Sequence, residues 1–376
     1  MNGDTVRRFE KAFAAYVGAE YAIALCNGTA TLHTALAALG VKAINPYEWN
    51  SGAWRQIRDG FNDNPRVAVP PLTMASTTIA VLHAGGVPVF ADVDPDTWTW
   101  NAAENLRHDF KAAVPVSLYG LHVEPDNVSD GIVYVDDAAQ TLRPINQVAA
   151  FTSYSFQASK ILSTGEGGML VTNDAELAKA ARQFVSLGYD LDGGSSTIDP
   201  ATLKHPTYAR HHSLGWNYRM ADAVAGHGLP DYDGATADSI ELPGTDLIFP
   251  HSYDALIYER RHCARLYREA HVGCSWIKAQ HVPEGWTHDY WTYAVALESA
   301  ELWQPFTEAI VRHGGEMPYG AWRITYQEPA FRYLAEDGTC PIAEDLQPRL
   351  VQFQTNSLES ARTNADAVAK AIAEIG

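Results

Sequence analysis

The sequence predicts an α/β fold with a mainly parallel central sheet covered by helices on both faces. Short apolar runs alternate along the chain with segments of helical periodicity. This is the pattern of parallel strands that are buried on both faces. The chain of 376 residues is also long enough for two domains that share a large core.

The first helix is expected to begin at Asp4, whose side chain can cap it, and to end at Gly18. The apolar run at residues 21–25 is suited to a buried strand. It leads through a small polar turn at residues 27–30 into a second helix. A strand, a turn of this kind and a helix together create a helix N-terminus that can hold an anion.

The same alternation continues through the first half of the chain. It predicts strands at residues 67–69, 87–90, 113–116 and 132–135, and a helix from Ser76 to Ala84. Two stretches interrupt the pattern. Residues 41–65 are expected to form a long surface excursion, and residues 228–252, rich in Asp, Gly and Pro, could be a linker or an insertion.

A second, smaller α/β domain is expected after that stretch. Its predicted elements are a strand at residues 291–297 and helices at residues 256–270, 303–312 and 360–375. We therefore predict a large domain at residues 1–250 and a small C-terminal domain at residues 251–376.

The composition favours an ordinary folded protein of the cytoplasm. The formal net charge of −18 argues against a nucleic-acid or anionic-membrane partner, because a phosphate-binding face needs clustered Lys and Arg. The four cysteines form no CxxC pair, so we expect reduced thiols and no metal site. No apolar signal segment follows Met1, and no run approaches the ~18 apolar residues of a transmembrane helix.

The most informative stretch surrounds Lys160. This lysine follows small, hydroxylated and apolar residues at 153–159 and precedes a glycine-rich turn at residues 165–168. A lysine that is to form a Schiff base needs a lowered pKa, and an apolar setting lowers it by disfavouring the ammonium form. The alternative interpretation is an ordinary surface lysine, which the stretch alone does not exclude.

A second candidate is the acidic pair Asp136-Asp137 at the end of the strand predicted at residues 132–135. A carboxylate buried at a strand end is costly unless it meets a cation. A protonated pyridine nitrogen is such a cation. The alternative is that one of the two acids caps a helix.

Six motifs, in this order along the chain, closely resemble those of the DegT-type sugar aminotransferase family. They are Asn27–Leu32, Val69–Thr73, Gly86–Asp94, Asp137–Gln140, Ser155–Lys160 with Gly165–Gly168, and Gly215–Met220. The resemblance runs from about Phe9 to the C-terminus. Members of that family are pyridoxal 5'-phosphate (PLP) enzymes of the aspartate-aminotransferase fold. The resemblance therefore implies a fold-type I transferase with PLP as its cofactor.

The resemblance also implies roles around the cofactor ring. Lys160 would form the Schiff base with PLP and then move the substrate proton. Asp137 would pair with the pyridinium nitrogen, and Gln140 would lie against one face of the ring. Met74 stands where the family usually has an aromatic ring, and its thioether can cover the cofactor in place of that ring.

A second set of implied roles concerns the cofactor phosphate. Thr29 and Ala30 would bind it through the turn, and Ser155 through its hydroxyl. Asn217 would reach the same phosphate from the neighbouring subunit, which makes a homodimer with shared sites the expected assembly. Arg219 is an open alternative to Asn217 in this role.

The activity that the resemblance implies is the transfer of an amino group from L-glutamate to a keto sugar, usually one attached to a nucleoside diphosphate. Some members are dehydratases with histidine in place of the lysine, so Lys160 favours transamination. A cyclitol or aminoshikimate-type PLP enzyme and a regulatory homologue that binds PLP without turnover remain alternatives. Arg323 could hold a substrate carboxylate or phosphate, or form an interdomain salt bridge.

Overall fold

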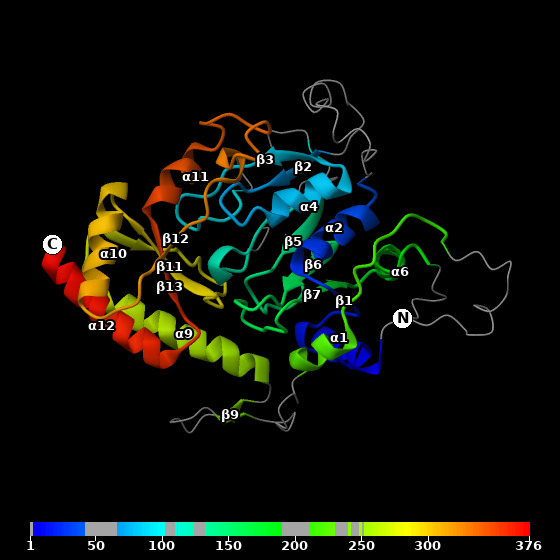
Figure 1. Ribbon diagram of the computed structural model, residues 1–376, viewed down its shortest axis with the longest axis horizontal. Helices are drawn as coiled ribbons and strands as arrows, with labels where there is room; N and C mark the ends of the chain where they lie inside the picture. Colours follow the sequence, from blue (N-terminus) through cyan, green and yellow to red (C-terminus); the bar gives the residue numbers. More distant parts are fainter. Residues whose placement is uncertain are drawn as a thin grey trace.

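The structure is a computed structural model that describes residues 3–41, 66–101, 110, 112–123, 132–189, 211–229, 240–241, 248–249 and 252–376. Its largest element is a seven-stranded sheet in the order β1-β7-β6-β5-β4-β2-β3 (Figure 1). The strands are β1 (Tyr21–Leu25), β2 (Arg66–Val69), β3 (Val87–Phe90), β4 (Ala112–Ala113), β5 (Val133–Asp137), β6 (Phe151–Ser155) and β7 (Gly168–Thr172).

The predicted mainly parallel sheet is confirmed. The pairings of β2 with β3 and β4, of β4 with β5 and of β5 with β6 are parallel. Only β7 runs antiparallel to its neighbours β1 and β6. Because the parallel strands point the same way, their carboxyl ends gather at one edge of the sheet, where sites in α/β folds form.

Helices cover both faces of this sheet. One face carries α2 (Gly28–Ala38), α4 (Ser76–Ala84) and α6 (Ala175–Val185), and the other carries α1 (Asp4–Val17). Successive residues of β7 alternate between the two cores: Leu170 packs in the first, Met169 and Val171 in the second. This burial on both sides is the physical reason for the near-continuous apolar runs of the sequence.

Helix α1 begins at Asp4 but is not capped by it. Gly3 occupies the N-cap position and has no side chain to accept a hydrogen bond. The acceptor for the N–H of Val6 is Asp222, at 2.9 Å. The predicted cap is therefore wrong, because Asp4 is itself the first helical residue and a carboxylate distant in sequence takes the capping role. The predicted end of the helix at Gly18, with a φ of 73°, is confirmed.

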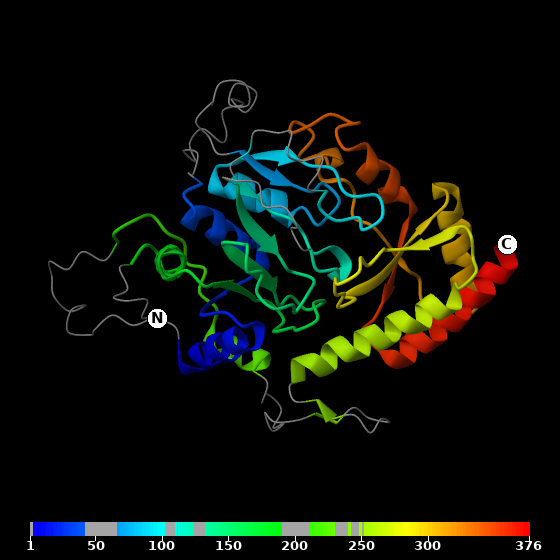
Figure 2. The ribbon, with the colours of Figure 1, turned by 180° about the vertical axis from the view of Figure 1, so that it is seen from behind.

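The C-terminal part of the chain forms a four-stranded antiparallel sheet in the order β10-β11-β13-β12. Helices α9 and α12 run side by side on this sheet, and α10 packs against α12 (Figure 2). The elements are β10 (Ile277–Ala279), β11 (Thr292–Leu297), β12 (Tyr319–Gly320), β13 (Leu350–Gln354), α9 (Ser252–Ala270), α10 (Trp303–Arg312) and α12 (Leu358–Ile375). The division of the chain into domains at residue 250 stays a prediction.

Short elements complete the described chain. They are α8 (Asp222–Ala225), α11 (Pro341–Leu346), β8 (Ile240–Glu241), β9 (Ile248–Phe249), and the 3-10 helices η1 (Leu118–Gly120), η3 (Gly226–Gly228), η5 (Ala300–Leu302), η6 (Thr325–Gln327) and η7 (Gln347–Arg349). Among the helices that the structure describes, none has the length and apolarity needed to cross a membrane.

The predicted elements differ from the structure in a few places. The strand expected at residues 113–116 is shorter, because Pro115 has no N–H to donate, although Val116 still forms a parallel bridge with Asp137. Strands β6 and β7 were not predicted. Nearly all of the expected excursion at residues 41–65, and most of the stretch at residues 228–252, lie outside the described residues.

Candidate active site

A cavity of about 560 Å³ lies where the carboxyl ends of β5 and β6 meet the start of α2. This is the edge at which a mainly parallel sheet places its sites. The structure brings together seven of the eight predicted site residues around it, and Asn217 is the exception. The seven are Thr29, Ala30, Met74, Asp137, Gln140, Ser155 and Lys160.

The start of α2 is held close against the end of β6. The side chain of Asn27 accepts a hydrogen bond from the N–H of Ala30 at 2.8 Å and caps the helix. A Cβ added to Gly28 would lie 2.7 Å from the Cβ of Ser155, so this approach requires glycine. The first N–H groups of a helix lack partners within it and carry partial positive charge. With the Ser155 hydroxyl beside them, they form a corner of the cavity suited to a phosphate.

Asp137 brings a buried carboxylate to the cavity and is 3% exposed. Its Oδ2 accepts a hydrogen bond from the Thr77 hydroxyl at 2.8 Å, and its Oδ1 accepts one from the N–H of Ala139 at 3.2 Å. Burial raises the pKa of this carboxyl, although the two hydrogen bonds and Lys160 oppose the rise. A turn rather than a helix follows Asp137, so the helix-cap alternative does not hold.

Lys160 lies in a turn after β6, where its N–H donates to the carbonyl of Gln157 at 2.8 Å. Burial lowers the pKa of its amine to about 8, while the charge of Asp137 opposes this shift. A fraction of the amine is therefore deprotonated near neutral pH and able to act as a nucleophile or a proton acceptor. The alternative of an ordinary surface lysine does not hold, because the side chain lines the cavity.

Gln140 and Met74 border the cavity in different ways. Gln140 is buried, and its Oε1 accepts a hydrogen bond from the N–H of Tyr119 at 2.5 Å, which fixes its amide. Met74 is 47% exposed, and its sulfur accepts a hydrogen bond from the N–H of Ser76 at 3.2 Å. Gln140 is thus a rigid part of the wall, whereas Met74 can adapt to what enters.

Three residues considered from the sequence do not line the cavity: Asn217, Arg219 and Arg323. Asn217 is exposed, although its neighbour Tyr218 does line the cavity. The backbone of Arg219 pairs with that of Leu25, at the end of β1, in an isolated antiparallel β-bridge. Arg323 is exposed, and no ion pair involves it within the described part of the chain.

Several residues of the cavity were missed by the sequence analysis. Trp291 and Trp322 line one wall and stack with their ring centres 5.8 Å apart and their planes 11° apart. Thr77 orients the Asp137 carboxylate from α4. No local pattern marks these residues, because each reaches the site from an element distant in sequence.

The groups around the cavity fit PLP. The corner of the cavity between Gly28 and Ser155 has no room for a Cβ on residue 28. It offers N–H and hydroxyl donors to a phosphate. The raised pKa of the buried Asp137 carboxyl indicates a charge that the protein's own groups do not balance, which a pyridinium would balance. Lys160 supplies the amine for a Schiff base.

Comparison with known proteins agrees with this arrangement. Residues 1–231 match the model of the DegT/DnrJ/EryC1/StrS aminotransferase family. The GDP-perosamine synthase of Caulobacter vibrioides is 32% identical over 241 residues, and the spore coat polysaccharide biosynthesis protein SpsC of Bacillus subtilis is 34% identical over 242 residues. Each match covers 60% of this chain and 56% of the relative. The chain thus spans little more than half the length of these relatives.

A solved structure of an aminotransferase from Psychrobacter cryohalolentis has the same fold. It is 23% identical, with a TM-score of 0.79, and the match covers 99% of this chain and 92% of that one. The prediction of a fold-type I architecture is confirmed. The family model, which matches well over half of the chain, decides membership: this protein belongs to the DegT/DnrJ/EryC1/StrS aminotransferase family.

Proposed function

We propose that this chain is a PLP-dependent aminotransferase that moves an amino group from L-glutamate to a keto sugar attached to a nucleoside diphosphate. The observation that carries the proposal is the placement of Lys160, Asp137 and the N-terminus of α2 around one cavity. The family supports it, as does the name of the Caulobacter relative, a GDP-perosamine synthase.

The chain's own residues divide the work. The start of α2 at Thr29 and Ala30 and the Ser155 hydroxyl would hold the cofactor phosphate, and the N–H of Ala30 also donates to the Asn27 side chain. Asp137, oriented by Thr77, would pair with the ring nitrogen of the cofactor and favour its protonated form. When bound, PLP supplies an electron sink for the carbanion that forms at the carbon carrying the amino group.

Lys160 moves the proton in this proposal. Its amine, with a pKa of about 8, can take the proton from the donor's Cα and return one to the cofactor side. Asp137 and Gln140 form a buried part of the wall near this amine. The overall exchange converts L-glutamate to 2-oxoglutarate and the ketone to an amine.

The site is completed by a second copy of the chain in this proposal. Asn217 lies on an exposed segment with two apolar neighbours, Leu214 at 96% exposure and Trp216 at 52%. Exposed apolar side chains that cluster in this way are typical of interaction surfaces. Covered by a partner subunit, this segment would let Asn217 reach the partner's phosphate site.

The remaining predictions belong to the same proposal. The cytoplasmic location expected from the sequence is part of it. The enzyme's large PLP-binding domain covers residues 1–250 and its small domain residues 251–376. The separate sheets of the two regions support this division.

Absorption spectroscopy tests the cofactor and the donor. Purified protein incubated with PLP should develop the visible band of a lysine-PLP Schiff base, and L-glutamate should then discharge it. Lys160→Ala should bind PLP without this band. Wild-type protein that takes up no PLP would contradict the proposal.

The acceptor is tested with the aminated form of the enzyme and a panel of keto sugars and cyclitols. Return of the visible band with nucleotide-linked keto sugars is the expected result. Return with cyclitols alone would favour the cyclitol alternative. A stable band that neither glutamate nor any acceptor changes would favour the regulatory homologue.

A further inference from the structure

Trp291 contacts the candidate catalytic lysine in two ways. The Nζ of Lys160 lies 4.4 Å from the centre of the indole ring. The indole N–H donates a hydrogen bond of 2.6 Å to the carbonyl of Ser159, the residue that precedes the lysine. The ring also stacks on Trp322. One side chain therefore touches both the amine of Lys160 and the backbone that carries it.

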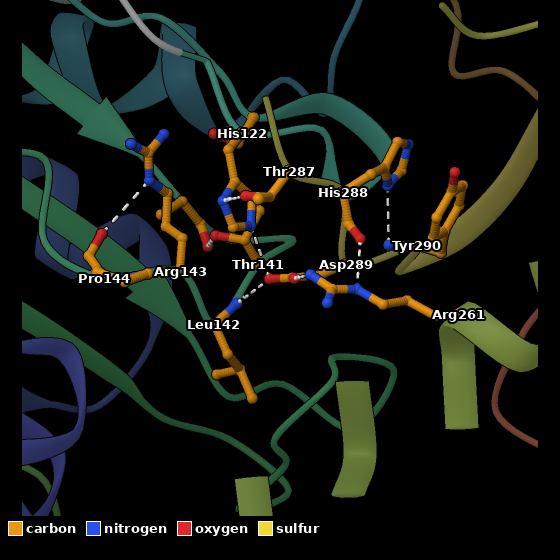
Figure 3. Close-up of polar contacts among 12 residues, drawn as sticks. His122, Thr141, Leu142, Arg143, Pro144, Arg261, Thr287, His288, Asp289 and Tyr290 are labelled. Atoms are coloured by element: carbon orange, nitrogen blue, oxygen red, sulfur yellow. Dashed lines mark hydrogen bonds and ion pairs between the residues drawn. The ribbon is translucent and has the colours of Figure 1, made fainter. Parts of the chain in front are cut away.

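The backbone just before Trp291 is fastened by a buried carboxylate. Asp289 is 1% exposed, and its Oδ2 receives His122 Nε2 at 2.8 Å and the N–H of Leu142 at 3.0 Å. Its Oδ1 accepts a hydrogen bond from the guanidinium of Arg261 at 3.1 Å. Figure 3 shows the carboxylate between these groups. We call Asp289, His122 and Arg261 the Asp289 clamp. It joins α9 to the loops of the large sheet.

Charge stabilises the clamp. Burial alone would raise the pKa of the Asp289 carboxyl, but the His122 side chain, the Leu142 N–H and Arg261 lower it below its usual value. Arg261 also donates from Nε to the carbonyl of His288 at 2.9 Å. The carboxylate is therefore the ionised centre of a polar network that fixes the chain at residues 288–289.

A backbone turn at Tyr290 connects Asp289 to Trp291. Tyr290 has a φ of 50°, which a residue with a Cβ rarely adopts. The His288 ring stacks on Tyr290 at 3.8 Å, and its Nδ1 accepts the N–H of Tyr290 at 2.9 Å. The proton of His288 is therefore on Nε2, which donates to Gln280 at 3.1 Å. The contacts of His288 with Tyr290 and Gln280 thus hold the turn that points Trp291 into the cavity.

The turn also packs against a loop of the large sheet. The N–H of Asp289 donates to the carbonyl of Gly120 at 2.8 Å. A Cβ on Gly120 would lie 2.8 Å from the backbone nitrogens of both Tyr290 and Trp291. The turn therefore packs directly on η1, beside the Tyr119 N–H that holds Gln140.

We propose that Trp291 is a positioning residue for Lys160: its ring face holds the amine, its N–H holds the Ser159 carbonyl, and the Asp289 clamp delivers the indole to that place. The role of Lys160 rests on the proposed function; the contact itself does not. A ring face attracts an ammonium and favours the charged form. The indole thus keeps the amine aimed at the cavity whenever it is not bonded to another group.

The test uses cofactor-free protein, so it does not depend on PLP. The rate at which Lys160 is acylated by a small anhydride is followed against pH by peptide mass spectrometry, which gives the pKa of the amine. In Trp291→Leu that pKa should fall by about half a unit to one unit, because the leucine keeps the site apolar but removes the ring face. Trp291→Phe retains a ring face but lacks the indole N–H, so its Lys160 pKa should lie between the values of Trp291→Leu and the wild type.

Other titratable groups around the cavity are Asp137, His83, Glu166 and Tyr218, and the substitutions leave all of them in place. Trp303→Leu is the matched control, since the Trp303 indole also donates to a backbone carbonyl, that of Leu350, away from the cavity. It should leave the Lys160 pKa unchanged. A pKa in Trp291→Leu that stays at the wild-type value, or rises towards 10.5, overturns the proposal.

The clamp is tested with Arg261→Gln, because Arg261 is the half-exposed member of the clamp. It should lower the Lys160 pKa in the same direction as Trp291→Leu, and the double variant should show no further shift. Additive shifts would overturn the link between clamp and indole.

If PLP gives no Schiff-base band while these shifts appear, the proposed function fails and the positioning contact stands.

Discussion

Lys160 and Asp137 carry opposite charges in one cavity, yet burial moves both towards their neutral forms. It lowers the pKa of the lysine and raises that of the aspartate, and in each case the attraction of the other residue only reduces the shift. Desolvation therefore outweighs their mutual attraction. The protein keeps two groups whose charge becomes favourable when a ligand supplies the missing partner, which is typical of functional sites.

This balance predicts the behaviour of Asp137→Asn. The variant should retain some PLP but lose on the order of 10²-fold or more in the half-reaction with L-glutamate, because an amide cannot balance a pyridinium charge. Stopped-flow absorption measures the rate. Asp136→Asn is the matched control: Asp136 is also buried, but it faces Arg143 at 3.9 Å rather than the cavity. Wild-type rates in Asp137→Asn would contradict the assignment.

The same substitution has a second readout in the cofactor-free protein. Because the folded-state pKa of Asp137 is raised, the native state binds the proton more tightly than the unfolded chain, so this group costs stability as pH rises through that pKa. Asp137→Asn should therefore be at least as stable as wild type at pH 7. A residue kept at the expense of stability is one that function requires.

At the scale of elements, the decisive contact is the approach of α2 to β6. Gly28 and Ser155 meet at a distance that leaves no room for a methyl group, and Asn27 caps the helix at the same point. The helix N–H groups and the serine hydroxyl are placed by this packing and not by either residue alone. The phosphate corner is therefore a property of two elements in contact.

Gly28→Ala tests this contact. The added Cβ would lie 2.7 Å from Ser155, so α2 or β6 must shift and the affinity for PLP should fall by about tenfold or more. Fluorescence titration with PLP measures it. Gly315→Ala creates a similar clash, 2.7 Å from Ile310, in the turn that follows α10 and away from the cavity. It should lower the melting temperature and leave the affinity unchanged, so equal loss of affinity in both variants would show only general destabilisation.

At the scale of the whole molecule, the proposal of a shared site depends on the exposed segment with Leu214, Trp216 and Asn217. Shared sites can be detected by mixing two inactive variants. Lys160→Ala lacks the amine, and Asn217→Ala lacks the group proposed for the partner's phosphate. Each alone should show little turnover.

Refolding the two variants together should restore up to about a quarter of wild-type activity, because half of randomly formed dimers are mixed and each mixed dimer has one intact site. Gel filtration would report the dimer directly. Full activity of Asn217→Ala alone would remove this residue from the site, and the same mixture made with Arg219→Gln would then test the alternative.

Much of the local structure could be predicted because its causes are local. Helices α4 and α10 have the predicted bounds, and the runs that became β1 and β3 are strands. The cap of α1 could not be predicted, because Asp222 comes from another part of the chain. Strand β6 was missed because its serine and threonine residues hide its burial, which the sheet and not the strand provides.

The sequence by itself determined the candidate residues of the cofactor site, since Thr29, Ala30, Asp137, Ser155 and Lys160 belong to the short motifs that carry the family resemblance, and all of them line the cavity. Only the tertiary structure decided what fixes them. Thr77 orients Asp137 from another element, and Trp291 reaches Lys160 across a separation of 131 residues through the Asp289 clamp. A motif encodes groups that are neighbours along the chain, whereas the orientation and pKa of a buried group depend on whatever the fold packs against it.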